Sequence, residues 1–325
     1  MSLVLKASLL LLVALIAGCS VLAEKRETSA RKTYPPIGQF VDVDGTRVHV
    51  WVKGTGPDLV LIHGAGGNLR DFTFALAEQL TDRYRVFAFD RPGHGWTDRL
   101  PGYGGLGNTK GESPLEQAAL LQKAADILGV KRPVVVGHSY GGAVTLAWGL
   151  NRPEDTAALV TLGGVSNPWP GDLDRLYTVT SSAIGGATVV PLITAFAPEA
   201  RIENALASIF SPQNPPEGYI DYIGTDLSLR RGALRANGQQ VNSLRPHIVK
   251  MEKRYADTLT MPIEIVHGTA DTTVPINVHA EKLITQVAGA RLARLKGVGH
   301  MPQHANASEV LAAIDRAATR AGVRP

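Results

Sequence analysis

The stretch PVVVGHSYGGAV, residues 133–144, places a serine where one kind of structure ends and another begins. The apolar run that leads to Gly137 is typical of a strand buried on both faces. The small and apolar residues after Gly141 favour a helix. Gly137, Ser139 and Gly141 match the pattern G-x-S-x-G, whose small residues permit a sharp turn that exposes the serine hydroxyl. We therefore predict that Ser139 is a nucleophile rather than an ordinary turn residue.

Similar short apolar runs recur along the chain, each ending in glycine or a polar residue, at 58–64, 84–90, 133–139, 157–164 and 262–268. Segments with helical character follow or separate them, at 68–80, 114–128, 140–152, 277–288 and 307–320. The alternation predicts an α/β fold with a doubly wound, mostly parallel sheet. Before these runs, apolar and polar residues alternate around Asp44-Gly45, which predicts an antiparallel hairpin.

The alternation stops over residues 166–258, where the sequence favours helices. We predict that this insertion is a helical cap and that 38–165 and 259–325 form the core. Because the insertion leaves after one strand and returns before the next, it should overhang the carboxyl edge of the sheet. Some of its apolar residues are expected to face a pocket there, from the set Trp169, Ile184, Val190, Leu192, Phe196 and Phe210.

Composition excludes several classes of protein. A net charge of +4, with no basic stripe interleaved with aromatic residues, argues against nucleic-acid binding. The single cysteine allows no internal disulfide, and no Cys/His cluster has metal-ligand spacing. The glycine-rich sequence HGAGGN, residues 63–68, lacks the lysine and the spacing of a phosphate-binding loop. We expect no metal, nucleotide or other cofactor.

The N-terminal region is expected to target the chain rather than to join the fold. Residues 1–18 contain Lys6 and then about a dozen apolar residues, as a signal peptide does. The sequence LIAGC, ending at Cys19, resembles the lipobox of bacterial lipoproteins, which implies that Cys19 is acylated. By the same resemblance Ser20 favours the outer membrane of the cell envelope. An uncleaved signal anchor and an ordinary secretory signal with a chance cysteine remain alternatives. The polar residues 19–37 are predicted to be a flexible tether.

A serine hydroxyl needs a base within hydrogen-bond reach, and that base must be oriented by a third group. Asp271 follows the apolar run at 262–268, and His300 lies in a glycine-flanked loop further on. The order Ser139, Asp271, His300 is the one found when the nucleophile lies on a strand-to-helix turn of such a sheet. We predict that these three residues form a catalytic triad.

Five motifs in order, HGAGG, DRPGHG, GHSYGG, HGTAD and GVGHMP, make residues 38–322 resemble the α/β-hydrolase family. The turn at Ser139 supplies the backbone N–H of Tyr140 to an oxyanion hole. The resemblance implies that Ala65 supplies the second N–H, with Gly66 and Gly67 as alternatives. It also implies structural or site-lining roles for the histidines of the motifs, His63, His94, His138 and His267. The other histidines have no motif context and are expected to be solvated or in the core, at His49, His247, His279 and His304.

The predicted function is that of a membrane-tethered serine hydrolase that cleaves an uncharged, ester-like substrate through an acyl-enzyme. Members of this family with epoxide hydrolase or dehalogenase activity carry a carboxylate where this chain has Ser139, which disfavours both activities. A cofactor-free perhydrolase (haloperoxidase) and a carbon–carbon bond hydrolase use the same triad and stay open. A lipid-anchored binding protein without catalysis is the alternative of another class, although all three triad residue types are retained.

Overall fold

The computed structural model describes residues 3–324, with side chains from residue 18 onward. Eight strands form one sheet in the order β1-β2-β4-β3-β5-β6-β7-β8. The strands are β1 (Gln39–Val43), β2 (Thr46–Lys53), β3 (Asp58–Ile62), β4 (Arg85–Phe89), β5 (Val134–His138), β6 (Ala158–Leu162), β7 (Ile263–Gly268) and β8 (Arg291–Leu295). All neighbours pair in parallel except β2, which is antiparallel to β1 and to β4. The predicted α/β class and the hairpin at Asp44 are confirmed.

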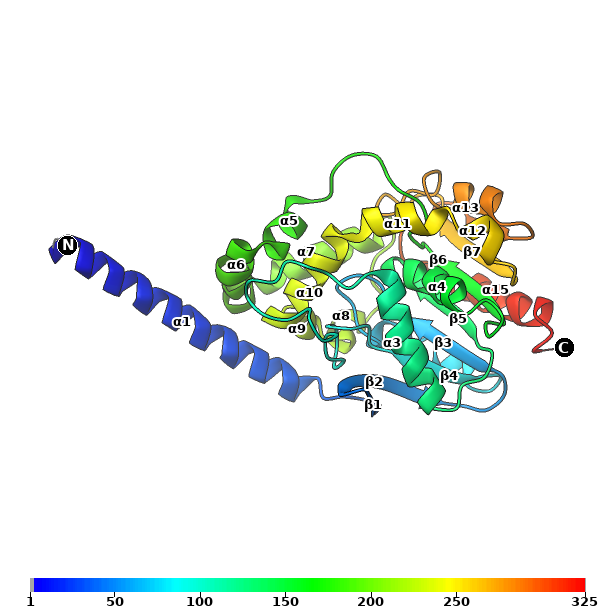
Figure 1. Ribbon diagram of the computed structural model, residues 1–325, viewed down its shortest axis with the longest axis horizontal. Coiled ribbons are helices and arrows are strands. Elements are labelled where there is room, and N and C mark those ends of the chain that lie inside the picture. The colour runs from blue at the N-terminus through cyan, green and yellow to red at the C-terminus, as the bar shows by residue number, and fades with distance from the viewer. Residues whose placement is uncertain (1–2, 325) are drawn as a thin grey trace.

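Helices cover both faces of the sheet (Figure 1). One face packs against α3 (Pro114–Ile127) and α4 (Tyr140–Asn151), and the other against α2 (Arg70–Thr73), the 3₁₀ helix η1 (Glu78–Leu80) and α15 (Ala307–Arg320). The helix α13 (Ala280–Gln286) and the short α14 (Pro302–Ala305) complete the core. At the start of α3, Ser113 and Glu116 form the capping box that their spacing favours.

Two elements of the core differ from expectation. The segment 68–80 is not one helix, because α2 and η1 are separated by turns in which the Ala77 N–H donates to the Phe72 carbonyl. Its helix-like spacing arises because Leu69, Phe72, Leu76, Ala77 and Leu80 all reach the core. The edge strand β8, which precedes His300, is not among the five continuous apolar runs, since it is partly exposed and lacks the pattern of a central strand.

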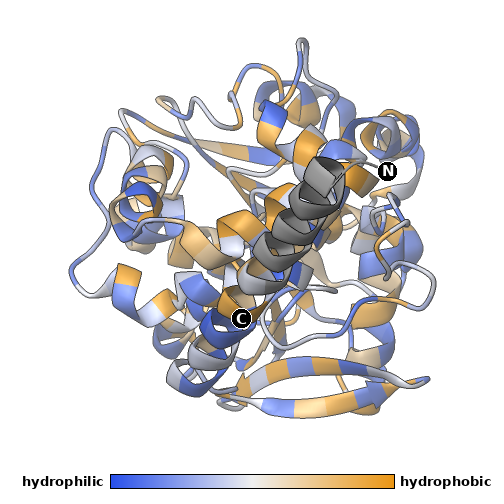
Figure 2. Ribbon diagram, turned by 90° about the vertical axis from the view of Figure 1, so that its left-hand side faces the viewer, coloured by the Kyte–Doolittle hydropathy of each residue, from blue (hydrophilic) through white to orange (hydrophobic). Residues whose placement is uncertain are grey.

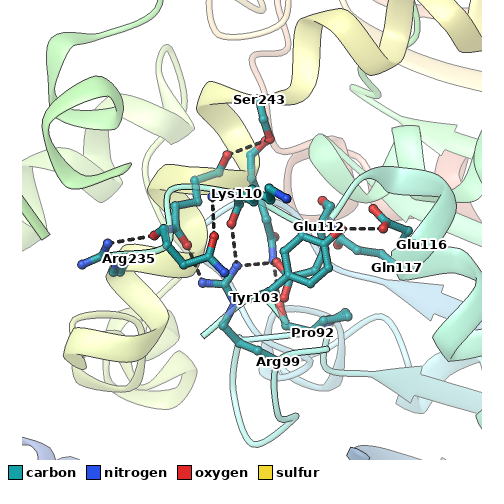
Figure 3. A network of polar contacts seen from close by, with 12 residues as sticks. Pro92, Arg99, Tyr103, Lys110, Glu112, Glu116, Gln117, Arg235 and Ser243 are labelled. Atoms are coloured by element: carbon teal, nitrogen blue, oxygen red, sulfur yellow. Dashed lines mark hydrogen bonds and ion pairs between the residues drawn. The ribbon is translucent and has the colours of Figure 1, made fainter. Parts of the chain in front are cut away.

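Helices fill the insertion between β6 and β7. They are α5 (Arg175–Ser181), α6 (Ala183–Phe196), α7 (Glu199–Phe210), α8 (Tyr219–Ile223), α9 (Thr225–Ser228), α10 (Arg231–Asn242), α11 (Leu244–Glu252) and α12 (Tyr255–Thr258). A polar network fastens α10 to the core (Figure 3). In it, the fully buried Glu112 pairs with Arg99 at 2.7 Å, and Gln240 Nε2 donates to the Pro92 carbonyl and to Glu112. Such a network holds the cap in one position over the core.

The segment predicted to be a flexible tether is instead helical through Thr33, as part of α1 (Leu3–Thr33). Ala23, Glu27 and Ala30 are buried and lie on one face of the helix, where α1 packs against α6 and α9. Glu27 accepts hydrogen bonds of 2.8 Å from the backbone N–H and the Nε of Arg231. The charged residues of this segment therefore form specific pairs with the cap. Because of these pairs, a segment with the composition of a linker forms a helix that packs against the cap.

Candidate active site

Ser139 lies at the turn between β5 and α4. Its backbone conformation is one that residues other than glycine rarely adopt. Its φ is 54° and its ψ is −118°, a strained combination for a residue with a Cβ. Two hydrogen bonds hold it there, because the Ser139 N–H donates to the Leu162 carbonyl at 3.0 Å and the Ser139 carbonyl accepts from the Val165 N–H at 3.1 Å. The neighbouring strand β6 thus fixes the direction of the serine.

The two glycines of the motif are required by close contacts. A Cβ added at Gly137 would collide with the Gly141 carbonyl and with Thr145 Oγ1. A Cβ added at Gly141 would collide with the Ile62 carbonyl at the end of β3. The turn is therefore sharp enough to place the serine between two strand ends only when both positions lack a side chain.

The structure brings the three predicted triad residues together. His300 Nε2 is 2.9 Å from Ser139 Oγ, and His300 Nδ1 is 2.8 Å from Asp271 Oδ2. Ser139, Asp271 and His300 follow β5, β7 and β8, whose carboxyl ends point the same way because these strands are parallel. Their exposed fractions are 8%, 6% and 3%, so bulk water is nearly excluded from the triad.

Asp271 is held as a carboxylate that orients the imidazole. Its Oδ1 accepts from the N–H groups of Thr273 and Val274, at 2.9 and 2.8 Å. Burial would raise the pKa of Asp271, but hydrogen bonds from His267 and His300 and the charge of His300 bring that pKa well below its usual value. An ionised Asp271 accepts the Nδ1–H of His300, which leaves the Nε2 lone pair directed at the Ser139 hydroxyl.

Two backbone N–H groups beside the serine are free to stabilise an oxyanion. Tyr140 is the first residue of α4, so its N–H has no acceptor within the helix. Within residues 3–324, neither this group nor the N–H of Ala65 donates to a protein acceptor. The N–H of Gly66, one of the alternatives, donates to Asn237 Oδ1 of α10 at 2.7 Å. Gly66 is therefore already paired, whereas Ala65 and Gly67 have no protein acceptor among the described residues, so the second donor stays a prediction.

Sequence reasoning missed a fully buried arginine beneath these donors. Arg91 Nε donates to the His63 carbonyl and its Nη2 to the Gly64 carbonyl, both at 2.9 Å. Its guanidinium also lies 4.4 Å from the centre of the Tyr140 ring. Burial lowers the pKa of Arg91 to about 10, so the group remains charged at neutral pH. Arg91 therefore supports both segments that carry the proposed N–H donors. In the sequence, Arg91 belongs to the motif DRPGHG, but no supporting role was predicted for it.

A second buried cluster, also missed, supports the loop that carries His300. Asp71 accepts from Tyr219 Oη and His304 Nε2, both at 2.8 Å, and from Gln303 Nε2 at 3.1 Å. Tyr219 belongs to the cap helix α8, whereas His304 follows the catalytic loop, so the cluster joins the two. No sequence motif could indicate it, because Asp71 and His304 come together only through the tertiary fold.

The apolar cap residues that were expected near a pocket divide into three groups. Val190 and Phe210 are buried, and Trp169 packs against the His279 ring at 6.3 Å between centres. Exposed to solvent on the outer side of α6 are Ile184, Leu192 and Phe196. These three residues do not face the protein interior, because α6 turns its opposite side to the protein.

Buried neutral histidines predict a loss of stability in mild acid. Burial lowers the pKa of His63 and His279 to about 3 and that of His138 to about 4. The unfolded chain binds these protons below about pH 6.5, before the folded chain does. The free energy of unfolding should therefore fall between pH 7 and 5, by about 2 kcal/mol for each histidine at pH 5.

Urea unfolding followed by circular dichroism at pH 5, 6, 7 and 8 measures this loss. His138→Asn should flatten the slope, whereas replacing the half-buried His247 should change it less. Depressed carboxylate pKa values such as that of Asp71 act only at more acidic pH. A free energy of unfolding that is constant from pH 5 to 8 would contradict the prediction.

Comparisons with known proteins agree with the α/β fold described above. A sequence model of the alpha/beta hydrolase family matches residues 59–314. An uncharacterized protein of Mycobacterium tuberculosis is 28% identical over 300 residues, which cover 88% of this chain and 82% of that protein. A 2-hydroxy-6-oxononadienedioate/2-hydroxy-6-oxononatrienedioate hydrolase of Escherichia coli is 26% identical over 299 residues, 85% and 94% of the two chains. The crystal structure of an alpha/beta hydrolase fold protein from Burkholderia ambifaria matches with a TM-score of 0.70 at 24% identity, covering 86% and 97%.

Proposed function

This chain belongs to the alpha/beta hydrolase family, and we propose that it is a serine hydrolase that cleaves an uncharged, ester-like substrate through an acyl-enzyme. The observation that carries the proposal is the position of His300, which bridges Ser139 and Asp271 through hydrogen bonds of 2.9 and 2.8 Å. A buried serine paired with an oriented imidazole has the arrangement of an activated nucleophile.

In the proposed reaction, His300 Nε2 takes the proton of the Ser139 hydroxyl while Oγ attacks the substrate carbonyl. The negative charge that forms on the carbonyl oxygen meets the N–H groups of Ala65 and Tyr140. His300 then returns the proton to the departing alcohol, which leaves an acyl group on Ser139. His300 then takes a proton from a water molecule, whose oxygen attacks the acyl carbon. His300 returns that proton to Ser139 Oγ as the bond to the serine breaks and the acid leaves. Asp271 stabilises the imidazolium in both halves of the reaction.

The buried cation near the site supports an uncharged substrate. Arg91 uses four of its five N–H groups on protein acceptors, namely the carbonyls of His63 and Gly64 and the side chains of Gln117 and Gln240. Arg91 is fully buried and its N–H groups already donate to protein acceptors, so it is not available to pair with a substrate carboxylate. A substrate acid group beside the triad would lose its hydration without gaining this partner.

A carbon–carbon bond hydrolase is the second candidate, and the similarity to the Escherichia coli dienedioate hydrolase favours it. The same triad serves both reactions, but the substrate named for that relative carries two carboxylates. Perhydrolysis is a third use of the same acyl-enzyme, with peroxide in place of water.

A fluorophosphonate probe followed by mass spectrometry tests the nucleophile, and a series of p-nitrophenyl esters tests the substrate. We expect labelling at Ser139. We also expect kcat/KM to rise about fourfold for each added carbon until the pocket is full, since each buried CH₂ contributes about 0.8 kcal/mol. Turnover of a 2-hydroxy-6-oxo-dienedioate without turnover of any ester would favour the second candidate instead. Peracid formation with hydrogen peroxide is measured in the same assay.

We further propose that the enzyme is attached to a bacterial membrane, the outer membrane, through acylated Cys19. The sequence LIAGC supports this proposal. A lipoprotein cysteine carries several acyl chains, which hold a protein far more firmly than one chain does.

Replacing Cys19 with alanine should therefore move the protein from the detergent-rich to the aqueous phase in Triton X-114 partitioning. The intact mass of the wild-type N-terminus should show the added acyl chains. Ser20→Ala is the matched control and should leave phase partitioning unchanged. Partitioning that is the same in the Cys19→Ala protein would indicate an uncleaved signal anchor.

A further inference from the structure

The outer face of α6 is apolar although it is exposed. Ile184, Thr188, Leu192 and Phe196 follow one another at intervals of four residues and so form one row along the helix. The three apolar members are 80%, 50% and 56% exposed. The Thr188 hydroxyl donates to the Ile184 carbonyl at 2.8 Å within the helix. A helix at the surface of a soluble domain normally has polar and charged residues on this side.

The apolar surface extends beyond α6. No charged residue occurs in residues 176–198, which include most of α5 and all of α6. Other large apolar side chains are exposed on α1 and α5, the helices that contact α6, at Val21, Leu22, Leu176 and Val179. We call these four residues, with Ile184, Leu192 and Phe196, the apolar cap face. Exposed apolar groups that gather in this way mark sites of interaction with a protein or a membrane.

The α5–α6 pair is not itself arranged to cross a membrane. Among the described residues, no single helix is both long and apolar enough for a span, and α5 and α6 reach that length only as a pair bent by 108°. Both helices also pack against α10. Their exposed apolar side chains therefore point outward from one long side of the helices, as on a helix that lies along a surface.

The helix α1 leaves the protein beside this face. Arg26 Nη1 donates to the Ala197 carbonyl at the end of α6, at 2.8 Å, and Arg26 pairs with Asp226 at 3.1 Å. Leu22 lies one helical turn before Arg26, and Cys19 lies about one turn further, so both are close to α6. Figure 1 shows α5 and α6 at the end of the molecule from which α1 projects, and Figure 2 looks onto that end.

The path of α1 is fixed rather than flexible. Burial would raise the pKa of Glu27, but hydrogen bonds and charge from Arg231 bring that pKa below its usual value, so the carboxylate pairs with the arginine at neutral pH. Together with the Arg26 contacts, this pair holds α1 against the cap. A membrane that is reached from Cys19 is thus always on the same side of the protein.

We infer that the apolar cap face rests on a lipid bilayer, with α6 lying in the plane of the interface. The inference relies on the proposed attachment near Cys19, which brings the bilayer within a few helical turns of α6. Each exposed apolar side chain is stabilised when it leaves water for the acyl region. The cap over the triad then sits at the membrane, so the esters that it meets are those dissolved in the bilayer.

Site-directed fluorescence tests this inference on the full chain. Ile184→Cys, Phe196→Cys and, as a matched control, the exposed Ile127→Cys of α3 are labelled with bimane after purification. An acylated Cys19 has no free thiol, and each variant is repeated with Cys19→Ala to remove that site. The proteins are reconstituted into vesicles of phosphatidylethanolamine and phosphatidylglycerol, with or without brominated acyl chains.

Bromolipids should quench the label at Ile184 and Phe196 by about half or more and should leave the label at Ile127 nearly unchanged, since only the first two positions would reach the acyl boundary. Unquenched labels on a protein that floats with the vesicles would overturn the inference but not the attachment. A protein with Cys19 intact that does not float would overturn both. A blue-shifted emission at Ile184 without bromolipid quenching would assign the face to a second copy of the chain. None of these fluorescence measurements depends on ester hydrolysis. The ester assay and the fluorophosphonate probe therefore test the triad chemistry independently.

Discussion

Replacing Ser139 with alanine is expected to lower kcat for p-nitrophenyl ester hydrolysis by about 10⁴-fold or more and to abolish fluorophosphonate labelling. The substitution removes the attacking oxygen and one 2.9 Å hydrogen bond to His300. It leaves the backbone bonds of the turn in place, since the Ser139 N–H to Leu162 bond does not involve the hydroxyl. The fold should therefore survive. Residual turnover should come only from the oxyanion hole and substrate binding.

Ser113→Ala is the matched control for this substitution. It removes the hydroxyl that caps α3, where Ser113 Oγ accepts from the Glu116 N–H. The free energy of unfolding should fall by about 1 kcal/mol, as for other N-caps, while kcat stays within about twofold. Circular dichroism and urea unfolding of both variants separate the two effects. If the Ser139→Ala enzyme keeps its turnover or is labelled at another serine, Ser139 is not the nucleophile.

Replacing Asp271 with asparagine should lower kcat by about 10⁴-fold at all pH values. The carboxylate Oδ1 accepts from the backbone N–H groups of Thr273 and Val274, and the asparagine carbonyl would keep these bonds. The amide NH₂ would then face His300 Nδ1, where Oδ2 lies in the wild-type enzyme. It would donate to Nδ1 and so place the imidazole proton on Nε2. In that tautomer His300 cannot accept the Ser139 proton.

Asp126→Asn is the control, because Asp126 is an exposed carboxylate that pairs with Arg152 at the protein surface and contacts no triad residue. Its kcat should change by less than about twofold, in line with the small energies of surface ion pairs. Pre-steady-state labelling with the fluorophosphonate should slow in parallel with kcat for Asp271→Asn, while KM changes little. A kcat within tenfold of the wild-type value would mean that another carboxylate orients His300.

The central strands and the order of the triad residues were predictable because their signals are local. A strand covered on both faces must be apolar throughout, as Val134, Val135 and Val136 are, so it is visible without an alignment. The edge strand β8 has solvent on one side and lacked that signal. The helical part of α1 after Cys19 was missed for a related reason. Its charges looked solvated, whereas Glu27 is buried against Arg231 of the cap.

The support of the site was not predictable from the residues that form it. Asp71, His304 and Tyr219 are distant along the chain, and each is unremarkable in its own segment. Their value lies in mutual hydrogen bonds inside a region of low dielectric, where an unpaired partner would be costly. Arg91 belongs to the motif DRPGHG, but only its contacts with the Tyr140 ring and the Gly64 carbonyl in the folded protein show its supporting role.

By itself, the sequence determined the α/β class, the turn at Ser139 and the identity of Asp271 and His300 as its partners. These features depend on short-range requirements, namely apolar runs for buried strands and glycines where a Cβ would collide. Only the tertiary structure decided which groups hold the segment that carries Ala65, how the cap is attached to the core and which side of α6 meets solvent. Those outcomes depend on burial and pairing between segments far apart in the chain. The local sequence of one segment does not indicate which distant segment it will contact.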